Sequence, residues 1–497
     1  MKSNKHIEYK SILKRLHCTT LLILCIAMLT ACAPNPTQDF VTGKNDGAFE
    51  SNIQETAPQQ SSNETSLTRT GSFSSTDGSV EYVWNINQTI IDNPMPVIEA
   101  VPYFFTPEDV QQIATALFND ATFYDIGPKS ESHYSIGELN RKIDLLSRYA
   151  DKDTLYELVG PYVNYSDLQK LLESYKQQLE TAPTNDPRRI CDWSFKKESY
   201  YKDDGKYGMG DGTNDQLNIT TMIDGRSYNI AVDVRNKNDY QMSSISVTLG
   251  DGKGYIEREI QLMELCMTDM PTQAQVDSAA MQAQNSLDQM DLGEFLVAKT
   301  SISVIDAGSM PRYAIVVNAV PIIERIPGLW GHTGIIDANT DLNIESYKST
   351  YPMTYVRFIY NANCELVSFS MHGLTKLQSV KNDNVATLPI DELFTKTQTY
   401  LSLFDSESLD VITGNNAWVL SIDNNIPIES IEFKVGITGV QYGLARCDIA
   451  DTDNVFCYTP ALLFEGTINF YNKNTGALLD SSTVTLVTIN AVDGTII

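Results

Sequence analysis

The second half of the chain repeats one order of structural elements, and this repeat restricts the fold more than any other feature of the sequence. Helix patterns begin near Thr272 and near Pro389, and strand patterns follow each of them. In both segments a strand ends in Asn-Ala, at Asn361 and at Asn490, turns over roughly three residues and continues with an aliphatic residue. We therefore predict two copies of one α+β unit between about Thr272 and Ile497, each a helix on an antiparallel sheet. Two unrelated α+β segments that share this order by chance are the alternative.

The preceding part of the chain predicts a mixture of helices and strands. The run Thr106–Asp109 is typical of a helix start, with Thr as the cap, Pro in the first turn and acids near the positive end of the helix. Apolar residues spaced by three and four predict helices over 136–149 and 166–179. Asp224-Gly225 joins two alternating segments and predicts a hairpin. The predicted class is α+β, with an N-terminal mixed helical and β region over 80–265 and two units over 266–385 and 386–497.

The first residues have the order of a bacterial lipoprotein signal. Basic residues precede an apolar run from Leu21 to Leu29 that contains no acid. The run is shorter than the roughly 20 residues that cross a bilayer, so we predict a signal peptide over 1–31 rather than a transmembrane anchor. The run ends in Leu29-Thr30-Ala31-Cys32, which resembles the lipobox of bacterial prolipoproteins. We predict that the thiol of Cys32 receives a diacylglycerol.

The residues after the lipobox predict a flexible tether. From Ala33 to about Ser79 the chain is rich in Ser, Thr, Asn, Gln and Pro and has few large apolar residues. Such a segment buries too little apolar surface to fold, so we assign 32–79 to the lipidated cysteine and a disordered tether. The acyl chains on Cys32 would hold the protein to the extracytoplasmic face of the cell membrane.

The chain is strongly acidic. Its formal charge is -27, and removal of a signal peptide with five basic residues and one acid takes this charge to -31. A surface of this sign repels phosphate backbones, so we expect no nucleic-acid partner. A solvated acidic surface explains the charge without any specific partner.

Five cysteines follow Cys32, and none of them forms a zinc-binding pattern. Cys447 and Cys457 flank an acidic loop between two segments that predict strands. Two interpretations stay open for this pair: a cross-strand disulfide in an oxidising exterior, or two isolated buried thiols.

Several segments resemble known families. The helix pattern Pro271–Met290 and the ending Asn490–Ile496 look like the secreted PepSY-like domains, small α+β units with one helix on an antiparallel sheet. The whole chain resembles a lipoprotein family of Gram-positive gut bacteria known as a domain of unknown function, through its lipobox, its tether and the segments Phe105–Asp109, Val320–Ile322, Leu388–Glu392 and Asn490–Gly494. The resemblance implies PepSY-like units over 266–385 and 386–497. The last unit departs from the pattern, because Thr459-Pro460-Ala461-Leu462 stands where we expect a Val-Pro-x-Trp strand.

The sequence lacks the motifs of the common hydrolases. His133, His332 and His372 lie far apart and outside any His-Glu-x-x-His arrangement, which disfavours a zinc hydrolase. Ser194 and Lys197 match a Ser-x-x-Lys motif but lie in a strand-like stretch without the partner motifs of penicillin-binding folds. We predict no catalytic, cofactor-binding or metal-binding residues, and no cofactor.

Three loops remain as candidates for contact with a ligand, and one of them is the acidic loop with Asp448, Asp451 and Asp453, which is a loose calcium site or a solvated turn. Residues 337–341 alternate oxygen ligands, but Leu342 replaces the glycine of an EF-hand and Lys348 replaces its bidentate acid. This excludes a complete EF-hand and leaves a looser calcium site or a solvated turn. Trp330 and His332 lie in a loop with Pro and Gly, where a rigid aromatic side chain either contacts a partner or folds back onto its own core.

The resemblance to PepSY-like domains suggests binding rather than catalysis. Such domains occur in metallopeptidase propeptides and in envelope proteins that regulate a sensor kinase. We therefore expect a non-catalytic envelope protein that binds a peptide or a protein partner, such as a sensor kinase or a secreted peptidase. The alternatives are a solute- or glycan-binding lipoprotein of a transport system and an envelope hydrolase.

The lipidation of Cys32 predicts a clear result for its substitution. Cys32→Ala is expected either to release the protein from membranes or to leave its signal peptide uncut, because we predict no other anchor in the chain. Fractionation of cells and the intact mass of the product measure both outcomes. A processed protein that stays in the membrane fraction with this substitution would contradict the prediction.

Overall fold

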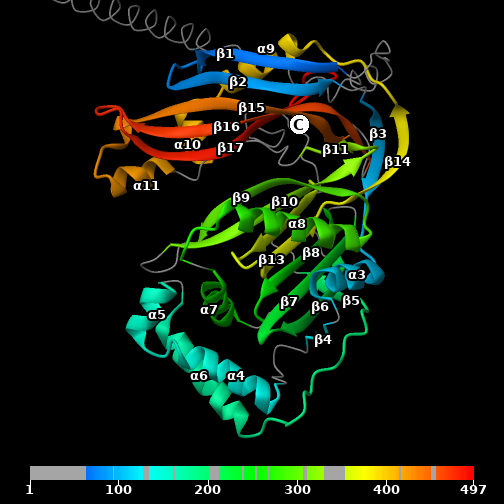
Figure 1. Cartoon of the computed structure of the whole chain (residues 1–497), viewed down its shortest axis with the longest axis vertical. Coiled ribbons are helices and arrows are strands. Elements are labelled where there is room, and N and C mark those ends of the chain that lie inside the picture. Colours follow the sequence, from blue (N-terminus) through cyan, green and yellow to red (C-terminus); the bar gives the residue numbers. More distant parts are fainter. Residues whose placement is uncertain are drawn as a thin grey trace, which may run out of the picture.

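The computed structural model describes residues 63–92, 95–119, 121–126, 134–160, 163–200, 212–237, 240–251, 254–266, 268–305, 311–329, 353–412, 416–448 and 455–497. These residues form a mixed α+β structure with two large β-sheets (Figure 1). In this view one sheet lies at the top, the second lies below it, and a layer of helices lies at the bottom. Within these ranges, no helix combines the length and apolar character that a membrane crossing requires.

The lower sheet has ten described strands in the order β11-β10-β12-β13-β8-β7-β6-β4, with β9 beside β10 and β5 beside β6. Helices α3 (Pro107–Phe118) and α8 (Gln273–Met290) pack against this sheet and share one hydrophobic core with it. The strands are β4 (Phe123–Asp125), β5 (Lys196–Tyr200), β6 (Gly212–Ile223), β7 (Arg226–Lys237), β8 (Tyr240–Leu249), β9 (Phe295–Ile305), β10 (Arg312–Ile323), β11 (Ile326–Pro327), β12 (Tyr355–Tyr360) and β13 (Leu366–His372).

The upper sheet has seven described strands in the order β1-β2-β15-β16-β3-β14, with β17 beside β16. Helix α9 (Ile390–Ser402) buries Leu393, Phe394 and Leu401 against this sheet. The shorter α10 (Ser406–Ile412), α11 (Asn416–Asp423) and the 3-10 turn η3 (Ile428–Ser430) follow it. The strands are β1 (Asn63–Ser74), β2 (Val80–Asp92), β3 (Val97–Pro102), β14 (Thr375–Asn382), β15 (Ile431–Asp448), β16 (Phe456–Asn472) and β17 (Leu478–Asn490).

The assignment of residues 63–79 to a disordered tether was wrong. Residues 63–74 form β1, which pairs with β2 in antiparallel register along its whole length. The segment is polar on average, but Leu67 is buried and the Phe73 ring stacks on Tyr82 at 4.9 Å between centroids. Pairing with a buried neighbour therefore orders a strand that its composition alone does not predict.

Local signals in the sequence predicted several elements correctly. At the start of α3, Thr106 accepts a hydrogen bond from the Asp109 backbone N–H and Asp109 accepts one from the Thr106 N–H, which completes a capping box. The hairpin of β6 and β7 turns at Asp224 and Gly225, whose φ angles of 50° and 79° are both positive, as a type I′ turn requires.

The two halves of the predicted repeat each have a long helix before three paired strands, although α10, α11 and η3 come between α9 and β15 and the short β11 comes between β10 and β12. After α8, β10 lies between β9 and β12, and after α9, β16 lies between β15 and β17. Val317 on β10 and Leu463 on β16 thus lie on the second strand of each segment. Asn361 and Asn490 are both buried, and the side-chain oxygen of each accepts a hydrogen bond at 2.9 Å from the backbone N–H two residues later. The turn after Asn490 is one residue longer, because the Asn490 N–H donates to the carbonyl five residues later, whereas the Asn361 N–H donates to the carbonyl four residues later.

The sheets do not follow the predicted domain boundaries. β13 pairs with β8, so the sheet of residues 266–385 continues into the sheet of the N-terminal region. β14 leaves that sheet and pairs with β3, and β2 runs parallel to β15. N-terminal strands therefore extend both sheets, and the boundaries at 265/266 and 385/386 stay predictions.

The bottom layer in Figure 1 consists of α4 (Ile136–Ser147), α5 (Lys152–Leu158), α6 (Tyr165–Leu179) and α7 (Tyr255–Leu265). These helices form a hydrophobic core of their own, which includes Leu146, Leu168 and Ile260. α7 is the next element after β8, an internal strand of the lower sheet, so the chain passes from the end of that strand into this layer.

The register of β15 and β16 supplies a prediction for the cysteines. Cys447 and Cys457 lie directly opposite each other in the antiparallel pair, both are buried, and the structure has no S–S bond between them. If the exterior is oxidising, an alkylating reagent is expected to label this pair in denatured protein only after reduction. Cys266, buried in the other core, is the control and is expected to react before reduction. Peptide mapping by mass spectrometry measures the labelling of the Cys447 and Cys457 pair and of Cys266. Labelling of Cys447 and Cys457 without reductant would exclude the disulfide.

Candidate functional site

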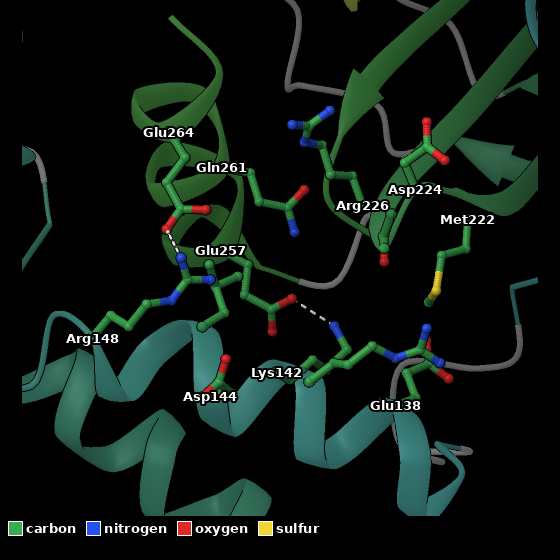
Figure 2. Close-up of a pocket in the computed structure, with 14 residues that line it drawn as sticks. Glu138, Lys142, Asp144, Arg148, Met222, Asp224, Arg226, Glu257, Gln261 and Glu264 are labelled. Carbon is green, nitrogen blue, oxygen red and sulfur yellow. Dashed lines mark hydrogen bonds and ion pairs between the residues drawn. The ribbon is translucent and has the colours of Figure 1, made fainter.

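A charged pocket lies where the helical layer meets the turn between β6 and β7. It has a volume of about 290 Å³ and is lined by residues of α4, of α7 and of the β6–β7 turn. Figure 2 shows its acidic and basic side chains facing one another across the space between these three elements. Among its lining residues are five acids and four bases. The pocket is therefore polar, with a small excess of negative charge.

Local sequence features position the three elements that line the pocket. Ser135 caps α4 by accepting a hydrogen bond from the Glu138 backbone N–H at 3.3 Å. Helix α7 buries Ile256, Ile260 and Met263 in the core of the helical layer. The tight turn at Asp224 and Gly225 brings the end of the hairpin over both helices.

The floor of the pocket is a buried ion network centred on Lys142. Its ammonium nitrogen lies 2.5 Å from a Glu257 oxygen and 3.0 Å from an Asp251 oxygen. The hydroxyl of Tyr134 donates to Asp251 and that of Tyr175 donates to Glu257. Lys142 also lies 4.6 Å from the centroid of the Tyr134 ring, within the range of a cation–π interaction. One cation thus holds two carboxylates, and two phenols complete their hydrogen bonds.

The protonation of this network follows from its contacts. Burial favours the neutral form of Lys142, but Glu257 and Asp251 outweigh burial and raise the pKa of Lys142. Burial also raises the pKa of the Tyr134 and Tyr175 phenols, and the neighbouring carboxylates add to this effect. Lys142 is therefore charged and the two phenols are neutral hydrogen-bond donors at neutral pH.

Two further ion pairs hold the upper walls of the pocket. Arg148 lies 2.7 Å from Glu264, which also accepts a hydrogen bond from the Tyr149 hydroxyl at 3.0 Å. Arg226 lies 2.7 Å from Glu365 in the turn after β12. These contacts engage Arg148 and Arg226 with carboxylates of the protein itself.

Glu138 occupies one corner of the pocket and is almost completely buried. Its carboxylate lies 3.2 Å from Arg188, yet neither of its oxygens has a hydrogen-bond partner among the described residues. Burial raises the pKa of Glu138, and the attraction of Arg188 and Lys142 offsets only part of this effect.

Gln261 is a pocket residue with a buried hydrogen-bond acceptor that lacks a donor. Its side chain extends from α7 into the pocket (Figure 2), and the residue is 7% exposed. The amide oxygen of Gln261 has no hydrogen-bond partner in the described part of the chain. A buried acceptor without a donor costs about 1–3 kcal/mol, so this oxygen is a site for a donor from outside the protein.

The residues predicted from the sequence lie elsewhere. Cys32, Trp330, His332 and residues 337–341 lie outside the described residues. Cys447 and Cys457 lie in the upper sheet. Where the chain is described, no group of three or more His, Cys, Asp or Glu could hold a metal ion. The sequence analysis missed the pocket, although Lys142 gave a signal, since it lies three residues from Leu139 and from Leu145 on the buried face of α4.

Comparisons with known proteins do not identify the chain. No family model and no curated protein matches it, so membership in the lipoprotein family stays a prediction. An uncharacterised protein from Eubacterium rectale of known structure is 8% identical and has a TM-score of 0.35, over 91% of this chain and 98% of that chain. The YpeB C-terminal domain from Bacillus megaterium is 8% identical with a TM-score of 0.23, over 58% of this chain and 88% of that domain. Both TM-scores are too low for the likeness to carry an argument.

The Lys142 network predicts a large loss of stability when its cation is removed. Lys142→Met leaves Asp251 and Glu257 buried without a cation and is expected to lower the free energy of unfolding by about 3–5 kcal/mol. Lys170→Met is the matched control, because exposed Lys170 on α6 forms a surface ion pair with Asp167 and such pairs contribute about 0–1 kcal/mol. Urea denaturation of the full chain measures both variants.

The same experiment has a defined pH dependence. A raised pKa means that Lys142 contributes its stability below the ordinary lysine pKa of about 10.4, and that this contribution is lost as the pH rises through the raised value. The difference between wild type and Lys142→Met is therefore expected to be constant across neutral pH. Equal urea midpoints for the two proteins at neutral pH would show that the network does not stabilise the fold.

Proposed function

We propose that this chain is a lipid-anchored, extracytoplasmic and non-catalytic envelope protein that binds a peptide or a protein partner. The observation that carries the proposal is the pocket beside α7, where the buried amide oxygen of Gln261 lacks a donor among the described residues. Native proteins rarely leave a buried acceptor unsatisfied, and functional sites are a common reason for the exceptions.

The size of the pocket favours a peptide or protein over a whole small solute. Sites that enclose a small ligand have volumes of roughly 300–1,000 Å³ and bury most of the ligand surface. At about 290 Å³ this pocket lies at the lower end of that range, and because it is open to solvent it does not enclose its occupant, which favours one side chain of a larger partner over a whole solute. The solute- or glycan-binding alternative therefore has less support.

The charged groups of the pocket also favour binding over hydrolysis. Lys142 holds Glu257, and Arg148 holds Glu264, each in a close ion pair. Each of these carboxylates is already engaged by a cation of the protein, so neither is placed to transfer a proton to a substrate. The envelope-hydrolase alternative is accordingly the least supported.

The assignment of the repeated segments to the PepSY-like class belongs to the same proposal. Its support is that a long helix, α8 or α9, precedes three paired strands in each segment, and that a buried asparagine, Asn361 or Asn490, begins the turn after the last of the three. In that class the resemblance implies regulation of a membrane sensor kinase or inhibition of a secreted peptidase, and both activities need a protein surface rather than an active site.

Affinity purification from envelopes tests the proposal. Tagged full-length protein is crosslinked in cells and purified in detergent, with an untagged strain as the control. A sensor kinase or a secreted peptidase that excess untagged protein displaces is the expected result. A permease would favour the solute-binding alternative instead. Hydrolysis of peptide or glycan libraries by the purified protein would contradict the non-catalytic proposal.

A further inference from the structure

Strand β9 leaves one long edge of the lower sheet without a second strand. It pairs with β10 along its length, and no other strand pairs with it among the described residues. Figure 1 shows β9 at the margin of the lower sheet that faces the upper sheet. From Leu296 to Val304 every residue is at least partly exposed. A strand in this position presents a row of backbone N–H and C=O groups that a further extended chain can pair with.

The side chain of Gln284 on α8 occupies the first positions of this edge. Its amide oxygen accepts a hydrogen bond from the Val297 N–H at 3.0 Å, and its amide nitrogen donates to the Phe295 carbonyl at 2.8 Å. A side-chain amide carries the same kinds of donor and acceptor as a backbone peptide group. Gln284 therefore takes the place of a neighbouring strand at this point, which shows that the outer side of β9 is oriented for pairing.

Beyond Gln284 the edge continues without such a partner. From Thr300 to Val304 the backbone has no hydrogen bond other than its pairing with β10 in the part of the chain that the structure describes. The register with β10 is regular from Lys299 to Ile305. Because successive residues of an antiparallel strand bond to opposite sides, every second residue of this segment directs its backbone groups outward. The segment is about as long as an ordinary strand, so it can pair with a complete one.

The edges of the upper sheet differ from β9. Natural sheets protect their edges with bulges and charged side chains. Edge strand β14 has both, with two register shifts and the basic residues Lys376 and Lys381. Edge strand β1 is regular but polar, and only Leu67 is fully buried among its described side chains. β9 has one charged residue, Lys299, which pairs with Glu465 at 3.2 Å, so the segment after it lacks charged protection.

From this edge we propose that β9 binds an extended segment of a peptide or protein partner as an added strand of the lower sheet. Ile302 packs partly against the core of that sheet, and Val304 lies on the same face with 57% of its surface exposed. Apolar side chains at alternate positions of the added strand would pack beside these two residues. The site is separate from the pocket beside α7 and goes beyond the function proposed for that pocket.

The surroundings of β9 favour a single extended segment over a second copy of the chain. The ion pair between Lys299 and Glu465 on β16 places the upper sheet close to one end of the edge. An added strand needs only about 4.8 Å of sheet width. A second copy that paired through its own β9 would bring its upper sheet to the same place. The occupant that fits beside the upper sheet is therefore one strand, and its backbone supplies most of the contacts.

Hydrogen-exchange mass spectrometry on full-length protein in detergent tests the site. The probe is the N-acetylated, C-amidated peptide Lys-Thr-Val-Thr-Val-Thr-Lys, which alternates apolar and polar residues. We expect it to slow exchange in residues 299–305, because their outward N–H groups gain acceptors, and to leave β1 unchanged. A second peptide carries N-methyl groups on two neighbouring central residues, which removes one donor from each side of the strand. It is expected to bind at least about tenfold more weakly.

A matched pair of substitutions connects the binding to β9. Val304→Lys places a charge beside the added strand and is expected to weaken the peptide by about threefold. Val380→Lys is the control, because Val380 is 50% exposed on edge strand β14 and its substitution is expected to leave the affinity unchanged. Both residues are exposed, so both variants are expected to fold.

Each result decides for or against the site. Unchanged exchange of β9 in excess peptide, equal affinities of the two peptides, or equal effects of the two substitutions would overturn it. Slow exchange of β9 without peptide that increases with protein concentration would show a second copy at this edge and would also overturn it. If envelopes yield a kinase or a peptidase while the peptide leaves β9 unchanged, only this inference fails. If the peptide protects β9 and no such partner is captured, the site stands and the proposed function fails.

Discussion

The buried ammonium group of Lys142 connects α4 to the segment after β8, which lies 109 to 115 residues later in the chain. It holds Asp251 after β8 and Glu257 on α7, and it belongs to α4 itself. Two carboxylates cannot stay ionised in a buried position unless a cation compensates them. The position of α7 against α4, and hence the width of the pocket between α7 and the β6–β7 turn, therefore depends on this one charge.

The same principle separates the pocket into two layers with different tasks. Below, Lys142, Asp251 and Glu257 form close ion pairs, and the Tyr134 and Tyr175 hydroxyls donate to the two carboxylates. Above, the amide oxygen of Gln261 is buried with no donor in the described structure. The Lys142 network thus holds the walls of the pocket in place beside a buried acceptor that has no donor. This arrangement is expected of a binding site whose walls are fixed before the ligand binds.

Elements with local signals could be predicted from the sequence, and those that depend on distant pairing could not. The capping box at Thr106 and the Asp224-Gly225 turn act over a few residues, so their residue types predict them directly. Strand β1 is polar and acquires its order from β2, so composition assigned it wrongly to the tether. The sequence did not predict the pocket, because its residues come from three separate segments. Its one local signal was Lys142, a charged residue on the apolar face of α4.

The parallel pairing of β2 with β15 joins Val80 to Phe433, near opposite ends of the chain. During synthesis or export from the N-terminus, the upper sheet cannot close until most of the polypeptide has emerged. Until then the apolar side chains of β2, such as Tyr82 and Trp84, lack the neighbours that cover them in the finished sheet. Long-range pairing of this kind folds slowly and exposes strand edges to aggregation, so the chain would depend on chaperones early in its life.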